Sequence, residues 1–134
     1  MNIQEIVDNF GLFDDWEERY RYLIDLGGRL PLMPESLKTE ETKVRGCMSQ
    51  VWMVLGWDDK KGLTMLADSD AQIVKGLIAV LMALFIGKTA EEIRATDIDK
   101  LFSSLGLDQH ISPNRRNGFY AMVERVRAFT ARSS

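Results

Sequence analysis

The chain has 134 residues and a formal net charge of −3, with 46% hydrophobic and 28% charged residues. These values are typical of one globular domain that is long enough to bury a hydrophobic core. The excess of acidic residues argues against nucleic acid as the main partner, because phosphate binding requires a basic surface.

The first 43 residues predict two helices and a loop. Apolar residues at helical spacing favour a short helix over residues 3–10, which Gly11 is expected to end. A second helix should begin near Asp14 and stop at Gly27 and Gly28. Its expected buried stripe consists of Trp16, Tyr20, Leu23, Ile24 and Leu26. Residues 29–43 contain two prolines and several polar residues, which predicts a loop.

The middle of the chain changes from a helical to a strand pattern. The segment QVWMVLGW, residues 50–57, is rich in strand-forming residues, and a polar turn over residues 58–62 precedes a returning strand, LTMLAD. A shorter strand from Lys43 to Arg45 would complete a three-stranded antiparallel sheet.

The remaining residues predict helices. Residues 70–86 are apolar on nearly all sides, which is typical of a buried central helix, with Ser69 or Asp70 as its cap. Short helices are expected after Thr89 and over residues 97–104, and a last helix from Pro113 to about residue 131. Its inward residues should be Phe119, Met122, Val123 and Val126. The fold class is therefore α+β, one domain over residues 1–134, with helices around a small antiparallel sheet.

The N-terminal sequence and the cysteine content argue for a cytoplasmic protein. MNIQEIVDNF has no signal-peptide pattern, and a single cysteine cannot form an internal disulfide. The longest apolar run, from Leu77 to Ile86, is too short to span a bilayer, so no membrane association is expected.

The single cysteine, Cys47, stands where the loop meets the first strand, in the segment VRGCMSQVW. Lone cysteines are often inert and buried. Here, however, Gly46 permits unusual backbone conformations and close approach, and Lys43 and Arg45 place positive charge near the sulfur. Positive charge favours the nucleophilic thiolate. The segment therefore indicates a reactive thiol.

The single histidine, His110, invites a cysteine–histidine dyad with Cys47. The two residues are far apart in sequence, and a histidine that only bonds local backbone is the simpler interpretation. One cysteine and one histidine also fall short of a zinc or iron–sulfur ligand set, so no metal site is expected.

Four segments in this order resemble the SufE family of sulfur-acceptor proteins. They are WEERYRYLIDLGGRLP from Trp16, VRGCMSQVW around Cys47, DSDAQIVKGLIAVL from Asp68 and HISPNRRNGFYAMV from His110. The resemblance implies the fold that SufE shares with iron–sulfur scaffold proteins. Met48, Asn114 and Arg116 depart from the pattern without touching the reacting sulfur.

The resemblance also implies a function in iron–sulfur cluster assembly. Cys47 would take sulfane sulfur from a pyridoxal-phosphate-dependent cysteine desulfurase, hold it as a persulfide and pass it to a cluster-assembly scaffold. Gly46 would shape the loop, and Lys43, Arg45, Arg115 and His110 would stabilise the thiolate or assist docking. The chain itself would need no cofactor, since the pyridoxal phosphate belongs to the partner. It would be a sulfur-transfer accessory protein rather than a complete enzyme.

Several alternatives stay open. A hydrolase could use Cys47 as its nucleophile and His110 as its base, although such an enzyme would also need an oxyanion site. A cluster scaffold is a third interpretation. The resemblance does not separate the Suf system from a second desulfurase system, and it leaves homodimer formation open.

Overall fold

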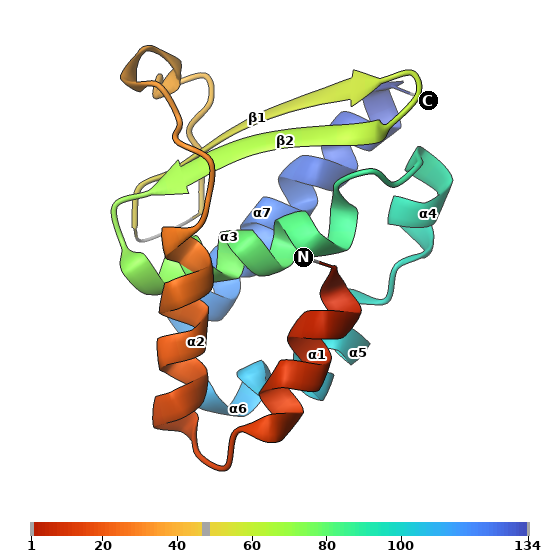
Figure 1. Cartoon of the computed structure of the whole chain (residues 1–134). Coiled ribbons are helices and arrows are strands. Elements are labelled where there is room, and N and C mark those ends of the chain that lie inside the picture. Colours follow the sequence, from red (N-terminus) through yellow and green to blue (C-terminus); the bar gives the residue numbers. More distant parts are fainter. Residues whose placement is uncertain (1, 47–48, 134) are drawn as a thin grey trace.

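The computed structural model is an α+β arrangement in which a curved two-stranded sheet lies over two long helices (Figure 1). The structure describes residues 2–46 and 49–133. The helices are α1 (Ile3–Leu12), α2 (Trp16–Gly28), α3 (Gln72–Phe85), α4 (Ala90–Ala95), α5 (Ile98–Ser104), α6 (Leu107–His110) and α7 (Pro113–Ser133), with a 3-10 turn, η1 (Glu35–Leu37). The strands are β1 (Val51–Asp58) and β2 (Gly62–Ser69).

The two strands form one antiparallel hairpin, with Val51 opposite Ser69 and Asp58 opposite Gly62. Alternate residues of β2, namely Leu63, Met65 and Ala67, are buried against the helices, which is the pattern of a sheet covered on one face. Within the described residues, no helix is both long and apolar enough to cross a membrane.

The prediction of a third strand over residues 43–45 is wrong. Only Lys43 pairs with the sheet, as an isolated bridge to Trp52. A turn precedes this segment, closed by the bond from the Thr42 hydroxyl to the Leu37 carbonyl, and a second turn follows at residues 45 and 46. The segment between the turns is too short to extend as a regular strand.

The central helix, α3, is buried along most of its length, as its apolar sequence predicts. It crosses α2 closely because both helices carry glycine at the crossing. A Cβ built on Gly76 would lie 2.4 Å from the Leu23 carbonyl oxygen, and one built on Gly27 would lie 2.7 Å from the Gly76 nitrogen. Neither position has room for a side chain, so this crossing fixes α3 beneath the sheet (Figure 1).

The helix predictions are correct in position but not in every detail. The first helix continues through Gly11 to Leu12, because Gly11 keeps a negative φ and the Phe13 N–H bonds to the Phe10 carbonyl. Ile24 is 38% exposed, whereas Leu23 and Leu26 are buried, so the expected stripe of α2 is narrower than predicted. The short helix α6 has no counterpart among the predicted elements.

The last helix, α7, supplies the predicted inward residues, and all of them are buried: Phe119, Met122, Val123 and Val126. It contacts α3 and α4, and its C-terminal part approaches the end of β1, where Trp57 stacks on Phe129 with ring centroids 5.9 Å apart. The helix therefore runs beneath the sheet from one end to the other (Figure 1).

Candidate functional site

The segment that contains Cys47 connects two paired arms of chain. The Val44 N–H donates to the Val51 carbonyl and the Met53 N–H donates to the Thr42 carbonyl, both at 2.8 Å. Val44 and Val51 are 3% and 0% exposed, so both ends of the connection are fixed in the core. Residues 45–50 are named the cysteine loop below. Cys47 and Met48 themselves lie outside the described residues.

The incoming side of the cysteine loop passes through Gly46, whose φ is +92°. Residues with a Cβ rarely adopt this left-handed conformation, whereas glycine does so without penalty. A Cβ at this position would also lie 3.4 Å from the Cβ of Ala121 on α7. The backbone here therefore depends on glycine, although its effect on sulfur chemistry stays a prediction.

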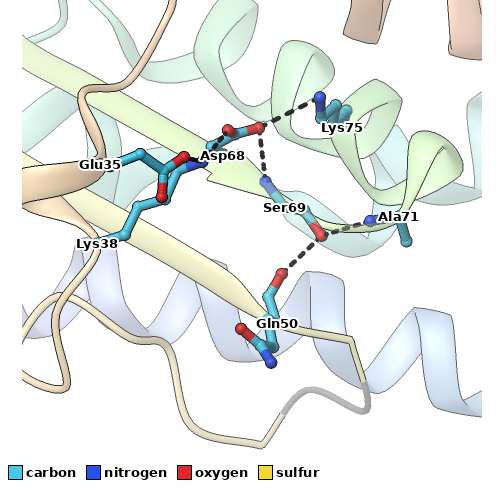
Figure 2. A network of polar contacts seen from close by, with 7 residues as sticks. All are labelled: Glu35, Lys38, Gln50, Asp68, Ser69, Ala71 and Lys75. Carbon is cyan, nitrogen blue, oxygen red and sulfur yellow. Dashed lines mark hydrogen bonds and ion pairs between the residues drawn. The ribbon is translucent and has the colours of Figure 1, made fainter.

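The outgoing side of the cysteine loop is tied to the turn between β2 and α3 (Figure 2). The Ser69 hydroxyl donates to the Gln50 carbonyl at 2.7 Å and accepts from the Ala71 N–H at 3.2 Å. The Gln50 N–H donates to the Asp70 carboxylate at 3.0 Å, and the Asp70 N–H donates back to the Gln50 carbonyl at 3.2 Å. Ser69 is buried, so the bonds of its hydroxyl are partly shielded from water, whereas Gln50 and Asp70 are exposed.

The sequence pattern predicts Ser69 or Asp70 as the cap of α3, and this prediction is wrong, because the helix cap is Ala71, which makes no side-chain bond. The register of the predicted hairpin could have shown that Ser69 and Asp70 lie beside Gln50. Once the turn is centred on Lys60, the antiparallel register places Val51 opposite Ser69 and so brings Gln50 level with Asp70.

An ion-pair network on the outer face of the sheet holds the preceding loop in place (Figure 2). The Lys38 ammonium lies 2.9 Å from both the Asp68 and Glu35 carboxylates, and Lys75 lies 3.5 Å from Asp68. Lys38 also lies over the ring of Trp52, 5.2 Å from its centroid. Because Lys38 stands five residues before the bridge residue Lys43, this network fixes the course of the chain toward the cysteine loop.

The network predicts a stability change at acidic pH. Partial burial raises the pKa of Asp68, but the bonds from Lys38 and the Ser69 N–H, with the charge of Lys75, outweigh it and lower that pKa below its usual value. A lowered pKa in the folded state stabilises the protein above the unfolded-state pKa of about 4, and this stabilisation is lost as pH falls through the folded-state pKa.

We therefore expect Asp68→Asn to be less stable than wild type in urea unfolding at pH 7, and the difference to be smaller when the measurement is repeated in acid, below the unfolded-state pKa of about 4. Asp25→Asn is the matched control, because Asp25 pairs with Arg29 on the exposed surface of α2 and surface pairs contribute little. If the difference in stability between Asp68→Asn and wild type is equally large at both pH values, the lowered pKa of Asp68 is not its cause.

A cavity of about 170 Å³ lies beside the cysteine loop, between the start of β1, α3 and the first turns of α7. The cavity has polar residues near the cysteine loop and the start of α7, and apolar residues toward the core. The first group is Ser49, Ser112, Asn114 and Arg115, together with Gly118, and the second is Val51, Val74, Leu77, Phe119 and Met122. The Nη1 atom of Arg115 is buried and has no hydrogen-bond partner within the part of the chain that the structure describes. A buried cationic donor of this kind favours a negatively charged group nearby.

The other predicted basic residues lie on the incoming side of the cysteine loop. Lys43 and Arg45 line a surface groove of about 370 Å³ between residues 40–45 and α7, and Arg45 is exposed. The structure thus brings Lys43, Arg45 and Gly46 to one side of the loop and Arg115 to the other. Their effect on the Cys47 thiolate stays a prediction.

His110 is held by α2. Its ring stacks on Trp16 with centroids 4.0 Å apart, and its carbonyl accepts from the Tyr20 hydroxyl. Neither contact involves the described residues of the cysteine loop. Among residues 2–46 and 49–133 there is also no cluster of three histidine, cysteine or acidic side chains able to hold a metal.

The fold and the anchored loop define a class of protein: a small α+β domain whose single cysteine stands in a connection fixed at both ends. The sequence matches the SufE family, described as an Fe-S metabolism associated domain, over residues 4–130. The chain belongs to the SufE family. Membership supports a role in iron–sulfur metabolism and sulfur transfer, in association with a cysteine desulfurase.

Individual relatives agree with this assignment. The chain is 45% identical over 130 residues to an uncharacterised SufE-like protein of Rhizobium meliloti, covering 95% of this chain and 93% of the relative. It is 45% identical over 129 residues to another from Rhizobium etli, covering 94% and 87%. A hypothetical protein from Thermus thermophilus, solved in solution, shares the fold with a TM-score of 0.78 at 18% identity, covering 97% of this chain and 93% of that one.

Proposed function

We propose that the protein accepts sulfur from a pyridoxal-phosphate-dependent cysteine desulfurase on Cys47 and thereby activates that enzyme. The observation that carries this proposal is the double attachment of the cysteine loop, through Val44 and Val51 on the core side and through Gln50 on the β2–α3 turn. A thiol between two fixed arms can be presented to a large partner in a reproducible place.

The transfer is a thiol–disulfide exchange, which balances without an added oxidant. The Cys47 thiolate attacks the outer sulfur of the persulfide on the desulfurase cysteine. A sulfur–sulfur bond forms on Cys47, the bond in the donor persulfide breaks, and the donor cysteine leaves as a thiolate. This thiolate is then free for another turnover, which is how acceptance would activate the desulfurase.

The surroundings of the cysteine loop support this chemistry. Positive charge from Lys43, Arg45 and Arg115 would stabilise a thiolate and a persulfide anion, although Glu40, Glu41 and Glu124 line the same groove as Lys43 and Arg45. The cavity beside Ser49 offers partly apolar cover, which would limit oxidation of the transferred sulfur. In this proposal His110 contributes at most to docking, since its described contacts are with α2.

The partners follow from the chemistry. The carbon–sulfur bond of cysteine is broken on the pyridoxal phosphate of the desulfurase, so this chain needs no cofactor of its own. The sulfur would pass on to a cluster-assembly scaffold in the cytoplasm. A hydrolase that pairs Cys47 with His110 would need the His110 ring beside the thiol, whereas that ring stacks on Trp16 of α2.

The test is desulfurase turnover. A cysteine desulfurase of the same type, supplied with cysteine and a reductant, should form alanine several-fold faster as this protein is added, and the effect should saturate. The control is the same protein with Cys47 blocked by iodoacetamide before mixing. If the unblocked protein leaves alanine formation unchanged at any concentration, the proposal is wrong.

A further inference from the structure

The side chain of Arg125 reaches from α7 to the chain that leads into the cysteine loop. Its Nη2 atom donates to the Glu41 carbonyl at 2.6 Å, and its Nη1 atom donates to the Lys43 carbonyl at 3.1 Å. The residues joined in this way are 84 and 82 positions apart in the sequence. One guanidinium therefore connects two distant segments of the fold.

The two carbonyls belong to residues 41–44, which lead into the cysteine loop and are named its incoming arm. Lys43 is the residue that bridges to Trp52, and the next residue, Val44, donates its N–H to Val51. The Thr42 carbonyl, between the two bound by Arg125, accepts from Met53 on the opposite side. The arm is thus held from both sides, by β1 on one and by Arg125 on the other.

The geometry suits arginine and not lysine. A guanidinium presents several N–H donors in a rigid planar fork, so two donors can reach two alternate carbonyls at once, whereas lysine offers one compact ammonium. The hydrogen bonds of Arg125 given by the structure are to neutral carbonyls. One turn earlier on the same helix, Ala121 faces Gly46, the last described residue before Cys47.

We propose that Arg125 is a positioning residue for sulfur acceptance. By holding the Glu41 and Lys43 carbonyls it fixes the arm that ends at Gly46, and so sets where Cys47 is presented. Arg125 has no part in the chemistry of the sulfur itself. The inference rests on the proposed function of Cys47.

The test compares Arg125→Lys and Arg125→Met with Arg132→Met. Arg132 is an exposed arginine of the same helix, and within residues 2–46 and 49–133 it bonds to the Ala128 carbonyl, so its replacement removes the same charge without touching the arm. Hydrogen exchange is measured at the Val44 and Met53 amides, whose hydrogen bonds join the incoming arm to β1. The Leu63 and Gly87 amides, which bond at the other end of the sheet, report general destabilisation.

We expect both Arg125 variants to exchange at Val44 and Met53 about tenfold faster, with Leu63 and Gly87 unchanged. The maximal rate of sulfur acceptance should fall about fivefold or more in both, with half-saturation by the desulfurase unchanged, because positioning affects the bound complex rather than its formation. Arg132→Met should behave as wild type in every measurement.

Three results would overturn the inference. Full recovery of sulfur acceptance in Arg125→Lys would show that only positive charge matters. Unchanged exchange at Val44 and Met53 would show that the arm is held without Arg125. Equal acceleration at all four amides would indicate a general structural role. If wild type accepts no sulfur, the proposed function fails, whereas the exchange data still show whether Arg125 holds the arm.

Discussion

The Cys47→Ser protein is expected to fold as wild type does and to leave the turnover of a cysteine desulfurase unstimulated. A serine hydroxyl is not ionised at neutral pH and cannot form a sulfur–sulfur bond, so it cannot displace the donor cysteine. We expect the loss of stimulation to be complete. Circular dichroism and urea unfolding would confirm that the variant is folded before its activity is compared.

The control for this result is binding. The serine variant should still compete with wild type for the desulfurase, because the docking surface is expected to lie largely outside the substituted side chain. Competition without stimulation would locate the defect in the covalent step. Stimulation by Cys47→Ser at the wild-type level would exclude the covalent mechanism and leave only activation through binding.

The second large effect is expected for Gly46→Val. The φ of Gly46 is +92°, and holding a residue with a Cβ in a left-handed conformation costs about 1–2 kcal/mol. The branched side chain would also approach Ala121. The loop can relieve both effects by changing its backbone path, so we expect sulfur acceptance to fall about tenfold or more while the core stays folded.

Gly87→Val is the matched control, because Gly87 also has a positive φ, +82°, but lies at the opposite end of the sheet. There the Gly87 N–H bonds to the Leu63 carbonyl, far along β2 from the cysteine loop. We expect this variant to lose stability and to keep its sulfur acceptance. If both valine variants accept sulfur at the same reduced rate, the conformation of Gly46 has no particular role.

Much of the fold follows from the sequence because the apolar patterns are strong. The run from Leu77 to Ile86 predicts the buried helix α3, and the alternation around residues 50–57 and 63–68 predicts the hairpin. Two failures have local causes. Gly11 does not end α1 because glycine stops a helix mainly when it adopts a left-handed conformation, and here it does not. The third strand fails because turns enclose it on both sides.

The candidate site was less predictable, because its supporting contacts join distant segments. In the sequence, Arg125, Arg127 and Arg132 are equivalent basic residues of one helix. Only the packing of α7 decides that Arg125 meets the incoming arm while Arg132 bonds to its own helix. The buried donor of Arg115, which has no hydrogen-bond partner among residues 2–46 and 49–133, likewise depends on where α7 begins relative to Ser49.

The most direct measurement of the central claim is the intact mass of the protein after incubation with a cysteine desulfurase and cysteine. Wild type should gain about 32 Da per sulfur atom, the gain should map to the peptide that contains Cys47, and a reductant should remove it, because a persulfide is a reducible sulfur–sulfur bond. A wild-type protein whose mass is unchanged while alanine is formed at the stimulated rate would contradict the claim that Cys47 accepts sulfur.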